Sequence, residues 1–272
     1  MSVKGIVMDI GGKVAIVTGG AYGIGRAIAL ALADAGASVC VFDRSGEALQ
    51  AVVGEVEAKH PGRAIGAVGN AANTDDISSV LRQTREAFGP IDLYCSNAGV
   101  ASPGVALDDK AWSESMETNL LAHIRAADLL LPEWQQRGSG YFLITASAAG
   151  LTTQLGDVAY SVTKHAAVAL AEWLSITYHG CGVGVSCLCP LGVKTNMLQQ
   201  LLENEEYDYS GAIGRVLDAD EVAQIVVEGI RNEQFLILPQ PEVLEFFRRK
   251  AADYDRWLGG MRRLQSQIRR PE

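Results

Sequence analysis

Two hydrophobic patterns alternate along this chain of 272 residues. Short apolar runs rich in branched and aromatic residues are typical of strands, and they occupy Val14–Thr18, Val39–Asp43, Ala64–Val68, Ile91–Ser96, Phe142–Ser147, Val183–Cys189 and Phe235–Leu238. Longer segments with apolar residues three or four apart predict helices, among them Ile24–Ala35, Asp76–Phe88, Ala111–Arg137 and Val158–Tyr178. This alternation predicts an α/β fold, a single doubly wound domain whose parallel sheet is flanked by helices on both faces.

Two segments depart from the alternation within residues 1–272. Residues 1–239 form the expected domain, and within it Thr195–Leu217 is predicted to be a substrate lid, because it follows the carboxyl end of the sixth strand. Residues 240–272 carry an apolar stripe that predicts an amphipathic helical extension, interrupted near Gly259-Gly260. We expect this extension to pack on the core or on a neighbouring subunit, since its arginines alone are weak evidence for a membrane surface.

Composition and charge narrow the classes of function. Hydrophobic residues make up 48% of the chain, enough for a sizeable core. The net charge of -9 argues against nucleic acid as a partner, because non-specific binding needs a basic footprint. No uncharged apolar run approaches the roughly 20 residues that cross a bilayer, and Met1–Asp9 lacks the apolar region of a signal peptide. We therefore expect a cytoplasmic protein that does not bind a membrane.

Cysteine and histidine spacings argue against a metal site. The five cysteines contain no C-x-x-C pair, and Cys187 and Cys189 alternate along a predicted strand, which suits buried reduced thiols. The four histidines form no cluster with zinc-ligand spacing.

A glycine-rich turn joins the first predicted strand to a helix. Gly19, Gly23 and Gly25 permit the tight turn and let backbone amides approach a pyrophosphate at the positive end of the helix, as in a Rossmann-type domain. The second strand ends at Asp43, eighteen residues beyond Gly25, where a carboxylate accepts both ribose hydroxyls and repels a 2′-phosphate. This favours NAD over NADP, although Arg44 beside it could pair with such a phosphate.

Ser147, Tyr160 and Lys164 form the candidate catalytic group. Tyr160 and Lys164 are four residues apart at the start of a predicted helix, so their side chains share one helical face. Tyrosine has an ordinary pKa of about 10, and a neighbouring ammonium stabilises the phenolate and lowers that pKa. Such a tyrosine can exchange a proton with an alcohol or ketone, and Ser147 can hydrogen-bond the same oxygen.

Six motifs, taken together, resemble those of the short-chain dehydrogenase/reductase family in its metal-free branch. They are Gly19-x-x-x-Gly23-x-Gly25, Asn97-Ala98-Gly99, Asn119, Ser147, Tyr160-x-x-x-Lys164 and Pro190-x-x-Val193-x-Thr195, and the resemblance spans about residues 12–238. It implies an oxidoreductase that acts on CH–OH donors with NAD as acceptor and interconverts a secondary alcohol and a ketone. Tyr160 would be the general acid/base, Lys164 would tune it and bind the nicotinamide ribose, and Ser147 would orient the substrate. Asn119 would hold a water in a proton relay.

The resemblance also implies a set of NAD contacts. They are Gly19, Tyr22, Gly23, Ile24, Gly25, Asp43, Arg44, Asn70, Ala71, Asn97, Ala98, Gly99, Tyr160, Lys164, Pro190, Gly192, Val193 and Thr195. Some positions depart from the family pattern: Ser96 and Asn70 replace a common asparagine and aspartate, and Leu191 replaces a glycine. Tyr22 stands where NADP-preferring members often carry a basic residue, which again favours NAD.

The expected substrate pocket is mostly apolar. Its wall would draw on Ala101–Val105, Ala149–Leu155, Leu191 and Met197–Leu202, which offer no cationic anchor. This predicts a small, hydrophobic, uncharged alcohol or ketone, contacted by Ser147, Ala149, Leu191, Met197 and Leu198. The helix after Lys164 is apolar on more than one side, which suggests a subunit interface, and the resemblance implies a homodimer or homotetramer.

Two other functions remain open from the sequence. An NADPH-dependent ketoreductase, for example of 3-oxoacyl thioesters, would share the same motifs, but Asp43 counts against it. A non-catalytic nucleotide sensor would share the fold, since fold alone does not prove activity; the presence of both Tyr160 and Lys164 counts against this alternative.

Overall fold

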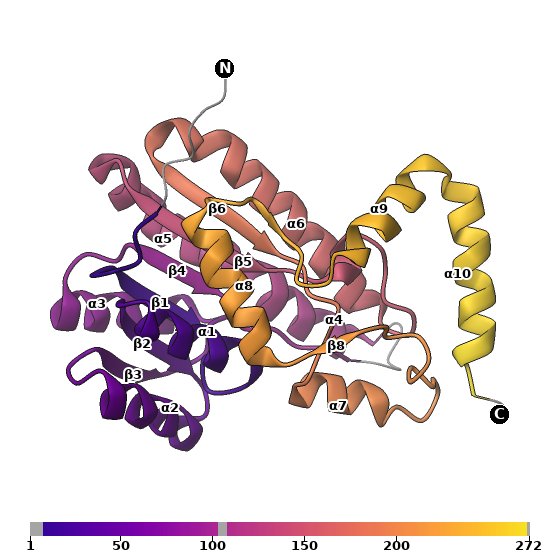
Figure 1. Cartoon of the computed structure of the whole chain (residues 1–272), viewed down its shortest axis with the longest axis horizontal. Coiled ribbons are helices and arrows are strands. Elements are labelled where there is room, and N and C mark those ends of the chain that lie inside the picture. Colours follow the sequence, from indigo (N-terminus) through magenta and orange to yellow (C-terminus); the bar gives the residue numbers. More distant parts are fainter. Residues whose placement is uncertain (1–7, 103–107, 271–272) are drawn as a thin grey trace.

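The computed structural model describes residues 8–102 and 108–270. Seven parallel strands form the central sheet in the order β3-β2-β1-β4-β5-β6-β9 (Figure 1). They are β1 Val14–Thr18, β2 Ser38–Asp43, β3 Ala64–Val68, β4 Leu93–Ser96, β5 Gly140–Thr145, β6 Val183–Leu188 and β9 Leu236–Ile237. The predicted doubly wound parallel sheet is confirmed. Its strand order reverses between β1 and β4, and a crevice opens beyond the carboxyl ends of strands at such a reversal.

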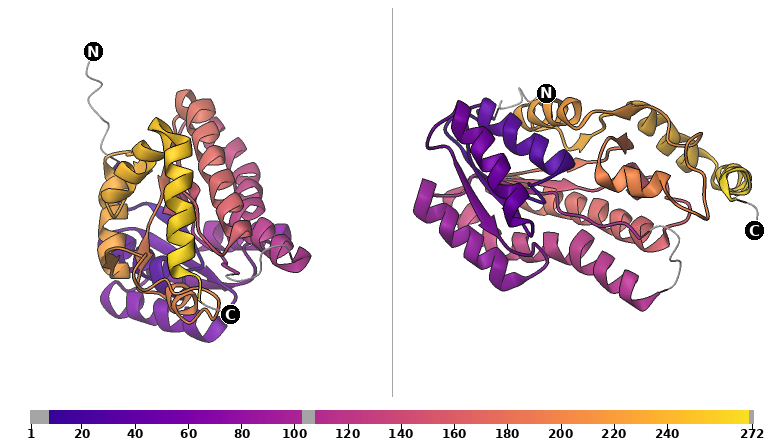
Figure 2. Two further views of the ribbon diagram at one scale, coloured as in Figure 1. Left: turned by 90° about the vertical axis from the view of Figure 1, so that its right-hand side faces the viewer. Right: turned by 90° about the horizontal axis from the view of Figure 1, so that it is seen from below.

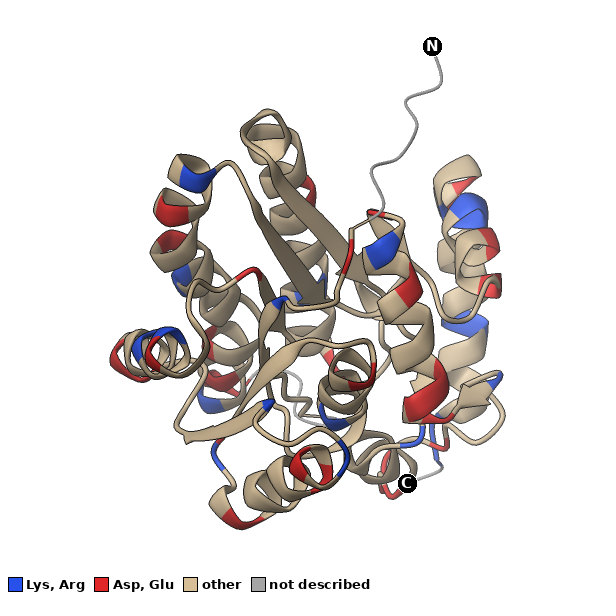
Figure 3. Ribbon diagram, turned by 60° about the vertical axis from the view of Figure 1, so that its left-hand side comes forward, with Lys and Arg blue, Asp and Glu red and all other residues tan. Residues whose placement is uncertain are grey.

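Helices cover both faces of the sheet (Figure 2). On one face α1 packs against α2 and α8, and on the other α5 packs against α3 and α6. Their bounds are α1 Gly23–Asp34, α2 Gly46–Lys59, α3 Thr74–Phe88, α5 Ala122–Arg137, α6 Val158–Tyr178 and α8 Ala219–Arg231. Charged residues lie on the outer helices and loops, whereas the strands are almost free of them (Figure 3), as expected for a sheet buried on both faces.

Two predicted elements end or break earlier than expected. The single helix predicted over Ala111–Arg137 is interrupted: α4, Asp109–Met116, and α5 are joined by a π-helical turn, Glu117–Leu121. The strand predicted over Phe142–Ser147 ends at Thr145, because the Ser147 hydroxyl accepts a hydrogen bond from the Ala149 amide at 3.1 Å and caps a short 3-10 turn, Ala148–Gly150.

The C-terminal extension consists of two helices, α9 Glu242–Ala252 and α10 Tyr254–Ile268. The predicted interruption at Gly259-Gly260 is wrong: the break lies at Asp253, which is extended and whose carboxylate accepts a hydrogen bond from the Arg256 amide at 2.9 Å. An acidic cap thus starts a new helix, and the two glycines lie inside it. We call α9 and α10 together the C-terminal hairpin; it projects from the edge of the molecule (Figure 1).

The predicted lid region meets the end of this hairpin. It contains α7 Asn196–Leu202 and β8 Val216–Leu217, which pairs with β7 Gly192–Val193. Between them, the Asp208 amide donates to the Ile268 carbonyl at 2.6 Å and the Arg270 amide donates to the Glu206 carbonyl at 2.8 Å. Tyr209 also donates its hydroxyl to the Leu155 carbonyl at 2.7 Å. The lid region is therefore tied both to the hairpin and to the loop before α6.

Candidate active site

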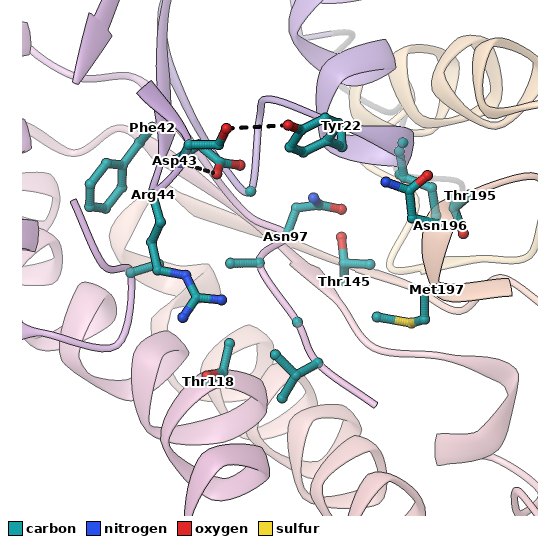
Figure 4. Close-up of a pocket in the computed structure, with 18 of the residues that line it drawn as sticks. Tyr22, Phe42, Asp43, Arg44, Asn97, Thr118, Thr145, Thr195, Asn196 and Met197 are labelled. Atoms are coloured by element: carbon teal, nitrogen blue, oxygen red, sulfur yellow. Dashed lines mark hydrogen bonds between the residues drawn. The ribbon is translucent and has the colours of Figure 1, made fainter. Parts of the chain in front are cut away.

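A first cavity of about 440 Å³ opens beyond β1 and β4, at the reversal of strand order. Figure 4 shows Asp43 and Arg44 on one side, Thr195 and Met197 on the other, and Asn97 between them. Fifteen of the expected NAD contacts line this cavity: Gly19, Tyr22, Gly23, Ile24, Asp43, Arg44, Asn70, Ala71, Asn97, Ala98, Gly99, Tyr160, Lys164, Pro190 and Thr195. Residues at the carboxyl ends of β1, β2, β3, β4 and β6, together with Tyr160 and Lys164 of α6, therefore line one cavity.

Three expected contacts lie elsewhere. Gly192 lines a second cavity, and Gly25 and Val193 line neither of the two. A side chain at Gly25 would collide with the Gly19 carbonyl and with the Asn97 amide. Gly25 therefore serves the packing of the turn, while Val193 is buried on β7 and accepts a hydrogen bond from the Thr195 hydroxyl at 3.2 Å.

The glycine turn leaves backbone donors free at the start of α1. Gly19 and Gly23 have φ angles of +62° and +51°, a region that glycine adopts without strain. Tyr22 precedes the helix and supplies no side-chain cap. Because the first amides of a helix lack partners within the helix and carry partial positive charge, they can bind an anion such as a pyrophosphate.

Asp43 sits at the mouth of the cavity and is held in place by two amides. Its carboxylate accepts hydrogen bonds from the Ala21 amide at 3.1 Å and the Ser45 amide at 3.0 Å. The Arg44 side chain extends into the cavity (Figure 4). A carboxylate at the end of β2 suits a ribose diol, whereas a nearby guanidinium suits a phosphate.

These residues fit a nicotinamide dinucleotide. The free helix amides match a pyrophosphate, and the cavity extends from Asp43 to Tyr160 and Lys164. The buried Thr145 hydroxyl, which lines this cavity, has no hydrogen-bond partner among the residues that the structure describes. A buried polar atom of this kind normally has a partner, so a bound ligand is a natural one.

Lys164 is buried beneath the inner end of the cavity. Its ammonium donates to the Thr145 carbonyl at 2.9 Å and lies 5.6 Å from the centre of the Tyr160 ring. Burial lowers the pKa of Lys164 to about 8, because the charged form loses its hydration. The pairing of the two side chains predicted from their spacing is present in the structure.

The pKa of Tyr160 differs from the sequence-based expectation. Burial raises it above the ordinary value, a hydrogen bond with Ser147 lowers it in part, and the charges of Asp157 and Cys189 raise it further. Burial is the largest of these effects, because desolvation penalises the charged phenolate, and it outweighs the lowering of the pKa by the Ser147 hydrogen bond.

Asn119 lies in the π-helical turn, and its side chain is fully buried. The amide oxygen accepts from the Val100 amide at 2.8 Å, and the amide nitrogen donates to the Val100 carbonyl at 2.9 Å and the Thr163 hydroxyl at 3.2 Å. The side chain therefore fixes the loop after β4 against α6. π-helical turns occur often at functional sites, and the expected water relay remains a proposal.

A second cavity, also of about 440 Å³, adjoins the first at Ser147. Ser147, Ala149, Leu191 and Leu198 line it as expected for substrate contacts, whereas Met197 lines the first cavity. Ala101–Val105 was expected in the wall, but part of it lies outside the described residues. The prediction that the wall offers no cation is wrong, because Arg249 lines the cavity. Its side chain donates a hydrogen bond to the Glu245 carboxylate at 2.8 Å.

The far wall of the second cavity comes from the C-terminal hairpin, which sequence analysis did not assign to the site. Trp257, Met261, Leu264 and Ile268 on α10 line it together with Phe246 on α9. The four α10 residues recur at spacings of four, three and four, so they share one helical face. That periodicity was the available signal, but periodicity does not tell which surface the face covers.

The described part of the chain also lacks two other kinds of feature. Within residues 8–102 and 108–270, no group of three or more His, Cys, Asp or Glu side chains is arranged to hold a metal ion. Over the same residues, no helix has the length and hydropathy needed to cross a bilayer.

Comparisons with known proteins all find similarity to dehydrogenases. A family model described as short chain dehydrogenase matches residues 13–206. The 1-deoxy-11-beta-hydroxypentalenate dehydrogenase of Streptomyces exfoliatus is 35% identical over 242 residues, covering 85% of this chain and 84% of the relative. The 3beta-hydroxysteroid dehydrogenase 2 of Eggerthella lenta is 31% identical over 192 residues, covering 69% and 74%. A solved short chain dehydrogenase/reductase from Burkholderia phymatum in complex with NAD has a TM-score of 0.82 at 27% identity, covering 91% and 96%.

Proposed function

Because the chain belongs to the short-chain dehydrogenase family, and is thus an oxidoreductase, we propose that it oxidises a hydrophobic secondary alcohol to a ketone with NAD. The observation that carries this proposal is the hydrogen bond between the side chains of Ser147 and Tyr160, which line different cavities. Tyr160 and Lys164 line the first cavity and Ser147 lines the second. An alcohol bound in the second cavity therefore has its hydroxyl beside the proposed proton acceptor.

The proton is handled by this chain's own residues. The Ser147 hydroxyl donates to the substrate oxygen and orients it, and the Tyr160 phenolate takes the hydroxyl proton as the carbon–oxygen double bond forms. Lys164, held by the Thr145 carbonyl at 2.9 Å, supplies positive charge that favours the phenolate and binds the nicotinamide ribose. When bound, NAD would supply the acceptor for the hydride that leaves the carbinol carbon.

The position of Asp43 favours NAD over NADP as the cofactor. The carboxylate lines the cavity at the end of β2, where it can accept from the ribose diol and repel a 2′-phosphate. The relative of known structure from Burkholderia phymatum was solved with NAD. Arg44 favours the alternative, an NADPH-dependent ketoreductase, because a guanidinium can pair with a 2′-phosphate.

The substrate class follows from the second cavity. Its wall is mostly apolar and aromatic, and its one arginine is paired with Glu245. Such a wall binds a hydrophobic alicyclic alcohol through burial of apolar surface. Two relatives are named for a hydroxypentalenate and a hydroxysteroid, and we propose a ring alcohol for this chain as well.

The test is an assay of NADH formation with Tyr160→Phe beside the wild type. We use cyclohexanol, a fused-ring sterol and a short hydroxyacid, each with NAD and with NADP. Wild type is expected to oxidise the ring alcohols with NAD, and Tyr160→Phe to lose turnover by about 100-fold or more. Binding of NAD, measured by calorimetry, is expected to change by no more than about twofold, since the ring remains.

The matched control is Tyr178→Phe, at the far end of α6, which is expected to keep full turnover. Unchanged turnover in Tyr160→Phe would contradict the mechanism. A clear preference for NADPH would contradict the cofactor assignment, and turnover of the hydroxyacid alone would contradict the substrate class.

A further inference from the structure

The C-terminal hairpin contains a buried lysine that the proposed mechanism does not use. Lys250, near the end of α9, is only 7% exposed. A buried ammonium is costly unless its three donors find acceptors. Its partners are two backbone carbonyls, one imidazole and two aromatic rings rather than a carboxylate.

All three donors of Lys250 are satisfied on the body of the protein. The ammonium lies 3.0 Å from the Leu151 carbonyl oxygen, 2.9 Å from the Thr152 carbonyl oxygen and 3.2 Å from the His165 Nε2 atom. His165 Nδ1 lies 2.8 Å from the Ser161 carbonyl, which can only accept, so Nδ1 carries the proton and Nε2 is free to accept from Lys250. The imidazole is therefore oriented for this lysine.

The same ammonium also holds the aromatic residues at the start of α10. It lies 5.1 Å from the centre of the Trp257 ring and 5.7 Å from that of Tyr254. Cations are attracted to the faces of aromatic rings, most strongly to tryptophan. Trp257 in turn lines the second cavity, one turn before Met261 on the same face of α10.

Lys250 thus joins the two opposite walls of the second cavity. Thr152 belongs to the wall that carries Ser147, and Trp257 belongs to the wall formed by the hairpin. We call these contacts of Lys250 the clasp. Both Lys250 and Trp257 belong to the C-terminal hairpin, outside residues 13–206, the part of the chain that the family model matches.

We propose that Lys250 is a positioning residue that fastens the C-terminal hairpin over the substrate cavity and so sets the affinity for fused-ring alcohols. This inference rests on the proposed function. A fused-ring alcohol whose hydroxyl lies at Ser147 extends across the cavity to Trp257 and Met261. A single-ring alcohol reaches Ser147 and Tyr160 without contacting that far wall, so its oxidation does not need the clasp.

The kinetic test compares Lys250→Met with the wild-type protein. Methionine keeps the apolar stem and removes the three hydrogen bonds. With a sterol as substrate we expect KM to rise at least tenfold while kcat changes less than about threefold, because the variant loses uniform binding rather than stabilisation of the transition state. With cyclohexanol, kcat/KM is expected to stay within about twofold. Equal effects on both alcohols, or no effect on either, would overturn the proposal.

A second measurement needs no turnover. Trypsin cleavage at Arg256, Arg262 and Arg263 of α10, followed by mass spectrometry in the absence of substrate, is expected to be at least tenfold faster in Lys250→Met. An unchanged cleavage rate overturns the clasp even if no tested alcohol is oxidised. A wild type that oxidises no alcohol, yet shows faster cleavage in the variant, contradicts the proposed function and not the clasp.

Two further variants test whether the change in KM comes from the hairpin wall. Trp257→Ala, which removes the wall residue without burying an unpaired group, is expected to raise the sterol KM as Lys250→Met does; an unchanged KM would overturn the proposal. Lys59→Met, at the exposed end of α2, is the matched control and is expected to match the wild type in both measurements.

Discussion

At the scale of single residues, Lys164 is a buried cation whose charged form is disfavoured in the native protein. Its ammonium is buried and has one carbonyl partner, and desolvation lowers its pKa to about 8. In the unfolded chain the pKa returns to 10.5. Between these two values the unfolded chain binds more protons than the native protein, so this residue makes the free energy of unfolding rise with pH.

The Lys164→Met variant is expected to be more stable than the wild type, by the largest margin below the native lysine pKa of about 8. The difference between the two free energies of unfolding should shrink by about 3 kcal/mol as the pH rises to 10.5, because a pKa change of one unit corresponds to about 1.4 kcal/mol. Urea unfolding at a series of pH values, without cofactor, measures this difference. The exposed control Lys59→Met is expected to show a constant difference, and a constant difference for Lys164→Met would contradict the prediction.

Residue pairs close in sequence were predictable, and pairs far apart were not. Tyr160 and Lys164 are four residues apart, so helical geometry alone places them together. Lys250 and His165 are 85 residues apart, and neither carries a local signal of the other. The raised pKa of Tyr160 was also not predictable, because its largest cause is burial, and burial depends on the whole cavity.

At the scale of elements, the turn between β1 and α1 requires α1 to approach the backbone of the turn closely at Gly25. A side chain at Gly25 would meet the Gly19 carbonyl and the Asn97 amide. The helix would then have to move away from the turn whose amides face the first cavity. Gly54, in the interior of α2, has open space around the same position.

Gly25→Ala is therefore expected to weaken NAD binding at least tenfold and to lower Tm. Gly54→Ala is the matched control, expected to leave NAD binding unchanged and to stabilise the protein by about 0.5–1 kcal/mol, because alanine favours a helix interior. Calorimetry for binding and thermal unfolding for stability measure the two effects. Equal behaviour of the two variants would count against a packing role for Gly25.

Element boundaries show where sequence periodicity stops being informative. Apolar spacing continues from α4 into α5, so the π-helical turn at Glu117–Leu121 leaves no break in the pattern. The hairpin break at Asp253 arises from a side-chain cap, while two glycines six residues later are tolerated inside α10. Caps and tertiary contacts decide such boundaries, and propensity is only a weak prior.

At the scale of the whole molecule, an apolar stripe runs along the outer face of α6. Val158, Val162, Trp173 and Ile176 are exposed there, and Ile176 is 82% exposed. Their spacings place them on one side of the helix. Exposed large apolar side chains on one side of a helix are typical of an interface between subunits, so we propose that the protein forms a homodimer or homotetramer through α6.

Ile176→Glu is expected to dissociate this assembly, because a buried carboxylate without a partner is costly. Sedimentation velocity should show an oligomer for wild type and mainly monomer for the variant. Ile225→Glu, which adds the same charge on α8 across the sheet, should leave the oligomer intact. A monomeric wild type would rule out the assembly, and an oligomeric Ile176→Glu would place its interface elsewhere.

The position of the C-terminal hairpin has a consequence for how this enzyme can change. The groups proposed for proton and cofactor chemistry lie between Gly19 and Thr195, whereas the far wall of the second cavity comes from residues beyond 240. One part of the substrate cavity therefore comes from a stretch of the chain separate from the proposed chemistry, while Ser147, Ala149 and Leu191 form another part of its wall. Replacing this tail by recombination or engineering is therefore expected to change substrate selectivity and to leave the proposed chemistry in place, provided the new tail brings a counterpart to Lys250.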